Sequence, residues 1–274
     1  MATLNQLLQK LWDDYSGMNK QAGGIYKLLT ARQEKIVNDH IAFRTFNIPK
    51  VGIDALAKVF VDFGYRPNGE YHFKEKKLYA RHFEHSDENY PKVFISELKL
   101  EECSPELQKI VKDLVAQVPD SLTKQWDFSV SGVLGVPSTP WKPLNFSAYE
   151  KLLAESEYAA WMSAFGFRAN HFTVYFNALK TFKSFPEFNE FLKKSGYKLN
   201  SSGGEIKGSP QEYLEQSSTL AHPVEVQFSD GKKTIPGCYY EFAKRYPLPN
   251  GKLFTGFVAQ SADKIFESTN VKKK

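Results

Sequence analysis

Apolar residues recur with two different periods along this chain, and the change between them predicts a mixed α+β fold. Near the N-terminus the apolar positions return every three or four residues, as on one face of a helix: Leu4, Leu7, Leu8, Leu11 and Trp12. The pattern predicts helices over residues 3–18 and 24–38, with a break at Gly23-Gly24 because glycine weakens a helix. Residues 40–47 are rich in aromatic and β-favouring side chains, which predicts a strand.

A strand followed by an amphipathic helix occurs twice in the sequence. One strand begins at His40 and the other contains His171 at the matching place. The helix after each strand ends at a Gly-Tyr pair, with Gly64 lying 24 residues after His40 and Gly196 lying 25 residues after His171. A repeated strand-helix unit indicates a duplicated fold. Two histidines at matching places can meet across its pseudo-twofold axis, which is one way to build a metal site.

Further strands extend both copies into modules. Strands near 78–85 and 92–99 give the first module the order β-α-β-β(-β). In the second module, the helix is followed by strands over 224–229 and 234–242, which are joined at an Asp-Gly pair typical of a hairpin turn. Residues 100–165 do not match the repeat, and their helical patterns, which include one helix from about 147 to 164, predict an insertion. We therefore expect a single domain of five consecutive parts: N-terminal helices (1–38), module 1 (39–99), a helical insertion (100–165), module 2 (166–262) and a tail (263–274).

The candidate chemistry lies on these strands. Alternation along a strand places His40 and Arg44 on one face of the first copy, and His171 on the equivalent face of the second. Glu241 lies in an apolar, aromatic strand, where a buried carboxylate costs several kcal/mol unless something compensates it. A metal ion would compensate it. Two histidines and one carboxylate with open positions form the facial triad of non-haem Fe(II) oxygenases.

Glu97 makes this set symmetric, because it lies in the part of module 1 that corresponds to Glu241. Three ligands suffice for a facial triad, so Glu97 is open as a fourth ligand, a pocket residue or a pairing partner. The ordinary interpretations are that a strand histidine is a hydrogen-bonded structural residue and that a strand glutamate is an exposed or paired charge. The matched positions of His40 and His171 favour the metal.

Other polar residues are candidates for binding a substrate. Arg44 follows His40 on the same face at a Cα distance of about 13 Å, so its side chain can reach a carboxylate several carbons from the metal. The alternative is an ordinary surface or ion-paired arginine. Gln216, Ser217 and Ser218 follow a Gly-rich segment and either line a pocket or form a plain polar loop.

Composition excludes several classes of protein. The chain is 42% apolar and 15% aromatic, as in a globular protein, and no run of 18 apolar residues predicts a membrane span. The net charge is +5, but Lys272–Lys274 supply three of these charges, which argues against a nucleic-acid surface. The N-terminus resembles no secretory signal, and only Cys103 and Cys238 occur, far apart. We expect a cytoplasmic protein without disulfides.

Three segments resemble the 2-oxoadipate dioxygenase/decarboxylase family, which is similar in fold to the vicinal oxygen chelate superfamily. They are residues 39–46, 214–221 and 240–243, within a resemblance that covers roughly residues 20–260. The resemblance implies two pseudo-symmetric βαβββ modules that form a curled mixed sheet around a metal site, with added helices. It also implies that His40, His171 and Glu241 bind Fe(II), and that Arg44 is the catalytic and substrate-binding clamp.

By the same resemblance the substrate is a small 2-oxo dicarboxylate, 2-oxoadipate, which O2 converts to 2-hydroxyglutarate and CO2 in lysine catabolism. A 2-oxo acid chelates a metal through its keto and carboxylate oxygens, and three protein ligands leave room for this chelate and for O2. The alternatives are a glyoxalase-like metal-dependent isomerase or lyase that uses Glu97 or Glu241 as a base without O2, and a binding protein that retains the duplicated fold. Two retained histidines weigh against the second.

Overall fold

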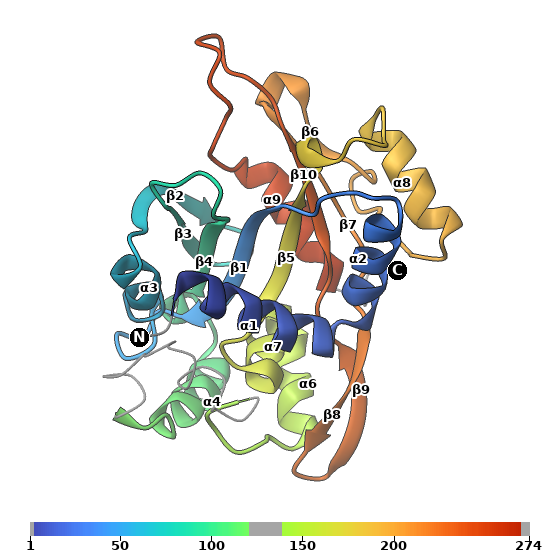
Figure 1. The fold of residues 1–274 in the computed structure, drawn as a ribbon. Coiled ribbons are helices and arrows are strands. Elements are labelled where there is room, and N and C mark those ends of the chain that lie inside the picture. Colours follow the sequence, from blue (N-terminus) through green and yellow to red (C-terminus); the bar gives the residue numbers. More distant parts are fainter. Residues whose placement is uncertain (1–2, 121–138, 270–274) are drawn as a thin grey trace.

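The computed structural model describes residues 3–120 and 139–269, which fold around one strongly curled eight-stranded mixed sheet (Figure 1). The strand order is β2-β3-β4-β1-β5-β10-β7-β6. The main-sheet strands are β1 (Asn38–Phe46), β2 (Arg66–Phe73), β3 (Leu78–Glu84), β4 (Lys92–Leu98), β5 (Ala169–Tyr175), β6 (Lys207–Ser209), β7 (Leu214–Ser218) and β10 (Glu241–Arg245). The described α-helices are α1 (Leu4–Met18), α2 (Lys20–Ala31), α3 (Ile53–Asp62), α4 (Pro105–Ala116), α6 (Phe146–Glu155), α7 (Glu157–Phe165), α8 (Phe185–Lys194) and α9 (Ala259–Phe266).

The predicted duplication is present in the sheet. Module 1 runs β1-α3-β2-β3-β4, and module 2 runs β5-α8-β6-β7-β10. In both modules the first strand pairs in parallel with the last, and the last pairs antiparallel with the strand before it. The modules join through the antiparallel pair β1–β5 at the centre, so the strand order reads symmetrically outward from that pair. The α+β class and the curled mixed sheet are therefore confirmed.

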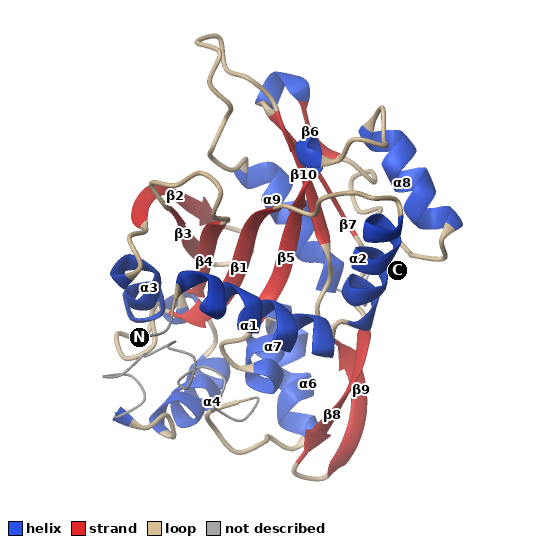
Figure 2. Ribbon diagram, viewed as in Figure 1, coloured by secondary structure: helices blue, strands red, loops and turns tan. Residues whose placement is uncertain are grey.

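The prediction of one strand over 234–242 is wrong. β9 (Gly231–Pro236) pairs with β8 (Pro223–Phe228) in a separate two-stranded sheet that lies apart from the main sheet (Figure 2), and β10 begins only at Glu241. Pro236 has no N–H to continue a ladder. At Gly237 a Cβ atom would lie 2.6 Å from the Val224 side chain, so only glycine lets the chain turn here.

The predicted break at Gly23-Gly24 is also wrong, because both glycines lie inside α2. The helices separate at Asn19, whose side chain accepts a hydrogen bond from the Ala22 N–H and so caps α2. Gly24 instead permits a close approach, since a Cβ atom there would lie 2.5 Å from the Tyr197 hydroxyl. The second helix ends at Ala31, earlier than predicted.

Two other helix boundaries differ from the predicted ones. The single helix expected over 147–164 is divided into α6 and α7 at Ser156, whose side chain caps α7 by accepting from Ala159 N–H. Residues 263–269, expected to begin the tail, belong to α9 and to the short 3-10 helix Glu267–Thr269. Lys272–Lys274 lie outside the described residues.

The two faces of the main sheet differ in chemistry. On the outer face Phe172 of β5 packs against Trp12 and Tyr15 of α1, with ring centroids 5.3 and 5.0 Å apart, and Phe242 of β10 packs against Phe188 of α8 at 4.7 Å. The inner face carries the polar residues of the centre, including His40 and His171. None of the helices in the described part of the chain is both long and apolar enough to span a membrane.

Candidate metal centre

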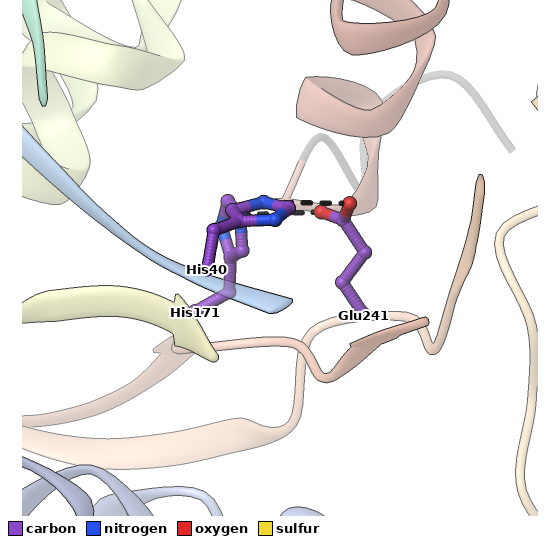
Figure 3. A group of neighbouring side chains, drawn as sticks. All are labelled: His40, His171 and Glu241. Carbon is purple, nitrogen blue, oxygen red and sulfur yellow. Dashed lines mark ion pairs between the residues drawn. The ribbon is translucent and has the colours of Figure 1, made fainter. Parts of the chain in front are cut away.

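Three buried side chains from the central strands converge on the inner face of the sheet (Figure 3). They are His40 of β1, His171 of β5 and Glu241 of β10, and one ligand atom of each lies within 4.8 Å of the others. The His171 Nε2 atom lies 3.1 Å from Glu241 Oε2, and the His40 Nε2 atom lies 3.6 Å from Glu241 Oε1. Within residues 3–120 and 139–269 this is the one such group of histidine, cysteine or carboxylate side chains. It could hold a metal ion.

Strand register explains this convergence across 201 residues of chain. In the β1–β5 pair His40 lies opposite Thr173, and Ala42 lies opposite His171. In the β5–β10 pair Glu241 lies beside Thr173. Paired residues point to the same face of a sheet, so three adjacent strands present His40, His171 and Glu241 together.

Register also settles where Glu97 lies. Glu241 pairs with Thr173, which lies two residues after His171. The equivalent position in module 1 is Ala42, two residues after His40, and Ala42 pairs with Phe94. Phe94 is therefore the module 1 counterpart of Glu241. Glu97 lies beside Thr45 on the other face, where its carboxylate accepts a hydrogen bond of 3.1 Å from the Ile53 N–H at the start of α3. The structure does not bring Glu97 to the metal ligands.

A buried ion pair fixes the orientation of His40. Asp39 Oδ1 lies 2.8 Å from His40 Nδ1, so a proton on Nδ1 leaves a lone pair on Nε2. That Nε2 atom accepts from the Thr173 hydroxyl at 3.0 Å and lies 3.6 Å from Glu241 Oε1. Arg245 donates to both Asp39 oxygens, at 2.6 and 2.8 Å, and its Nη1 donates to the Phe254 and Gly256 carbonyls. Burial alone would raise the pKa of Asp39, but Arg245 and His40 hold it well below its usual range. Asp39 is therefore a permanent anion behind the histidine.

The pKa values of the three candidate ligands are all shifted. Burial raises the pKa of Glu241 to about 8, although the hydrogen bond from Gln216 opposes this rise. Burial lowers the pKa of His171 well below its usual range, and the charges of His40 and Arg44 lower it further. Burial also lowers the pKa of His40, although Asp39 opposes this change. Both imidazoles are therefore neutral at pH 7, with a lone pair available for a metal, while Glu241 carries a proton.

Arg44 is buried near this site and is enclosed by protein groups. Its Nη1 donates to Glu157 Oε1 at 2.9 Å, and its Nη2 donates to Thr269 Oγ1 at 3.2 Å. Its guanidinium also lies over the rings of Tyr158 and Trp161, at 4.9 and 5.2 Å from their centroids. Its Nε atom has no hydrogen-bond partner.

The three polar residues of β7 lie in different surroundings. Gln216 Nε2 donates to Glu241 Oε1 at 2.6 Å, next to the candidate ligands. Ser218 contacts the Ser268 hydroxyl at 2.8 Å. Ser217 points the other way, because its hydroxyl donates to Asn189 of α8 at 2.8 Å. The structure thus brings Gln216 to the metal centre and leaves Ser217 outside it.

Comparison with known proteins identifies the family of this chain. The model of the 2-oxoadipate dioxygenase/decarboxylase family matches residues 2–255. The chain belongs to this family. The chloroplastic 2-oxoadipate dioxygenase/decarboxylase of Arabidopsis thaliana is 39% identical over 86% of this chain and 69% of its own length.

Two solved structures are also similar. Hydroxyglutarate synthase from Oryza sativa, solved in complex with 2-oxoadipate, is 35% identical with a TM-score of 0.89, over 97% of this chain and 91% of that one. A Shewanella frigidimarina protein, provisionally named a hydrolase, is 50% identical with a TM-score of 0.86, over 94% of this chain and 99% of that one. Membership of the family supports an enzyme.

Some residues around the candidate site can be recognised from the sequence and others cannot. Asp39 stands next to His40, and an acidic neighbour of a candidate ligand histidine is a usable signal. Arg245 lies 206 residues from Asp39 and Glu157 lies 113 residues from Arg44, so no local pattern connects these pairs.

Metal binding should release about one proton at pH 7. Glu241 must lose its proton to bind a metal, whereas both imidazoles are already neutral. Metal affinity should therefore rise about tenfold per pH unit from pH 6.5 and level off above about pH 8. Calorimetric titration with Zn(II) in buffers of different ionisation enthalpy measures this proton. Glu241→Gln should abolish the release, and no release from the wild type would contradict a protonated Glu241.

Replacing Asp39 with Asn should weaken metal binding and destabilise the protein. The substitution leaves Arg245 buried without its counter-charge, at a cost of about 3–5 kcal/mol in unfolding free energy. Loss of the carboxylate behind His40 should lower metal affinity about 10- to 100-fold. Asp14→Asn is the control, because the pair Asp14–Arg168 is partly exposed and its loss should cost less than about 1 kcal/mol. Equal effects of the two substitutions would exclude a special role for Asp39.

Proposed function

We propose that this protein is an Fe(II)-dependent dioxygenase that converts 2-oxoadipate and O2 to 2-hydroxyglutarate and CO2. The observation that carries the proposal is the buried His40, His171 and Glu241 group, in a chain that belongs to a family named for this reaction. The solved rice relative was crystallised with 2-oxoadipate, which supports a six-carbon 2-oxo diacid as the substrate. The reaction balances, because both atoms of O2 enter the two products.

The residues of this chain fit such a metal. Two neutral imidazoles and one carboxylate suit Fe(II), and three protein ligands leave up to three positions for a bidentate 2-oxo acid and O2. Bound Fe(II) would supply the redox chemistry with O2 that the side chains lack. Asp39 fixes the tautomer of His40, and Gln216 fixes the orientation of the Glu241 carboxylate. The burial of all three ligands excludes bulk water from the reaction.

Arg44 would bind the carboxylate at the far end of the substrate. It shares the inner face of β1 with His40, and its positive charge contributes to the lowered pKa of the buried His171. Glu157 and Thr269 hold its two terminal nitrogens, while its Nε–H remains available as a donor. Gln216 and Ser218 would contact the substrate from β7, whereas the Ser217 hydroxyl donates to Asn189 of α8.

The proposal also covers the cellular compartment and the pathway of the reaction. Cys103 and Cys238 are both free and buried, which is typical of a protein kept in a reducing compartment and supports a cytoplasmic location. The family resemblance supports a place in lysine catabolism.

Turnover should consume 2-oxoadipate and O2 in equal amounts and release one equivalent each of CO2 and 2-hydroxyglutarate. An oxygen electrode, together with quantification of both products, measures this stoichiometry for protein loaded anaerobically with Fe(II). The Zn(II) form should bind substrate without turnover, because Zn(II) is redox-inert. Product formation without O2, or equal rates with Zn(II), would favour the glyoxalase-like isomerase instead.

Arg44→Lys should lower kcat/KM for 2-oxoadipate about 10- to 100-fold while metal content stays unchanged. Lysine keeps the charge but has no counterpart of the Nε–H donor that is unpaired in Arg44, and its single nitrogen cannot reproduce the planar geometry of the guanidinium. A 2-oxo acid of the same chain length without the far carboxylate, 2-oxohexanoate, should lose much less. Arg168→Lys is the control, since Arg168 pairs with Asp14 away from the site. Unaltered kinetics of Arg44→Lys would show that another group holds the far carboxylate.

A further inference from the structure

Tyr239 lies against the metal centre although it is not one of the ligands. Its ring stacks on the His171 ring, with centroids 4.5 Å apart and planes inclined by 25°. It precedes Glu241 by two residues in the segment that leads into β10. The side chain is fully buried. Tyr239 is therefore in direct contact with one ligand and close in sequence to another.

The Tyr239 hydroxyl has no hydrogen-bond partner. Two other buried tyrosines are satisfied, since Tyr65 donates to the Pro91 carbonyl at 2.9 Å and Tyr158 donates to the Ser96 carbonyl at 2.7 Å. A buried phenol without a partner is destabilising, so an unpaired hydroxyl at a functional site indicates a group that is paired only when a ligand binds. At neutral pH a phenol is protonated and can donate.

The backbone around Tyr239 is held in place by two helices. Trp161 of α7 donates to the Gly237 carbonyl at 2.9 Å, and Tyr15 of α1 donates to the Tyr239 carbonyl. The hydroxyl is thus presented by a fixed main chain. Positioned polar groups of this kind bind a ligand at a low entropic cost.

The same region holds a second unpaired donor, the Nε–H of Arg44. The two are connected through Trp161, whose ring lies 5.2 Å below the Arg44 guanidinium and whose N–H holds Gly237. The same tryptophan of α7 therefore contacts the Arg44 guanidinium and holds the main chain that carries Tyr239.

We infer that Tyr239 is a substrate-contacting residue whose hydroxyl donates a hydrogen bond to an oxygen of the 2-oxo acid held between the metal and Arg44. The inference rests on the proposed function and deepens it. A 2-oxo diacid carries only oxygen acceptors along its keto and carboxylate groups, and these complement two donors that are otherwise unpaired. Together Tyr239 and Arg44 would select an oxygen-rich acid over an apolar chain of the same length.

Tyr240 offers a matched control. Its hydroxyl is also buried and unpaired, but its ring packs against Trp12 and Phe242, at 5.8 and 5.3 Å, on the outer side of the sheet. Tyr239→Phe and Tyr240→Phe therefore remove the same atom from two equally buried positions, and only one of these positions adjoins the ligands.

The experiment measures 2-oxoadipate binding to Zn(II)-loaded wild-type protein and to both variants by calorimetry, together with metal content and thermal unfolding. Tyr239→Phe should weaken binding about 10- to 100-fold, the range for a lost hydrogen bond to a charged group, and lower kcat/KM of the Fe(II) form similarly. Tyr240→Phe should bind within about twofold of wild type, because it removes no ligand contact. Both variants should retain the metal and unfold at or above the wild-type temperature.

The outcomes separate the inference from the proposed function. Wild-type affinity in Tyr239→Phe would overturn the inference, and so would a loss of binding that is accompanied by loss of metal, since the phenol would then only support His171. If the wild type binds 2-oxoadipate but consumes no O2, the proposed reaction fails while a selective effect of Tyr239→Phe on binding still supports the contact. If the wild type does not bind 2-oxoadipate, both fail.

Discussion

The antiparallel register between β1 and β5 is the constraint on which the candidate site depends. This pair joins the two modules and sets His40 and His171 on neighbouring strands of the same face. A shift of the register by one residue would turn one imidazole to the outer face, which is packed by aromatic side chains of α1. The hydrophobic contacts of Phe172 with Trp12 and Tyr15 oppose such a shift. Core packing on one face thus holds the chemistry on the other.

A second constraint is that the inner face buries several charges at once. Arg44, Asp39 and Arg245 are each no more than 6% exposed, and isolated charges at such depth are strongly disfavoured. Each is compensated: Arg245 pairs with Asp39, and Arg44 pairs with Glu157. Pairs of this kind contribute little to stability in themselves. In the proposed function, the Asp39–Arg245 pair orients His40, and the Arg44–Glu157 pair keeps the Arg44 cation in the buried site.

The two modules have the same topology but different roles. Module 1 supplies His40 and Arg44, whereas module 2 supplies His171, Glu241 and the polar strand β7. The site is asymmetric because Phe94 stands where symmetry would place a second Glu241. With Phe94 at that position, one side of the metal centre is apolar and the opposite side carries carboxylate and amide groups.

Local patterns in the sequence predict most of the helices and strands, because helical and alternating periods reflect which side chains of an element face the core. The two histidines of the candidate site are recognisable from their matching places in a repeat. The residues that meet across the sheet are set by strand register and by packing between distant segments. Glu97 and Glu241 occupy similar places in the chain, but strand register turns the first toward α3 and the second toward His171. The Asp39–Arg245 pair and the unpaired Tyr239 hydroxyl follow from contacts between distant segments, and such contacts are set by packing that no local pattern records.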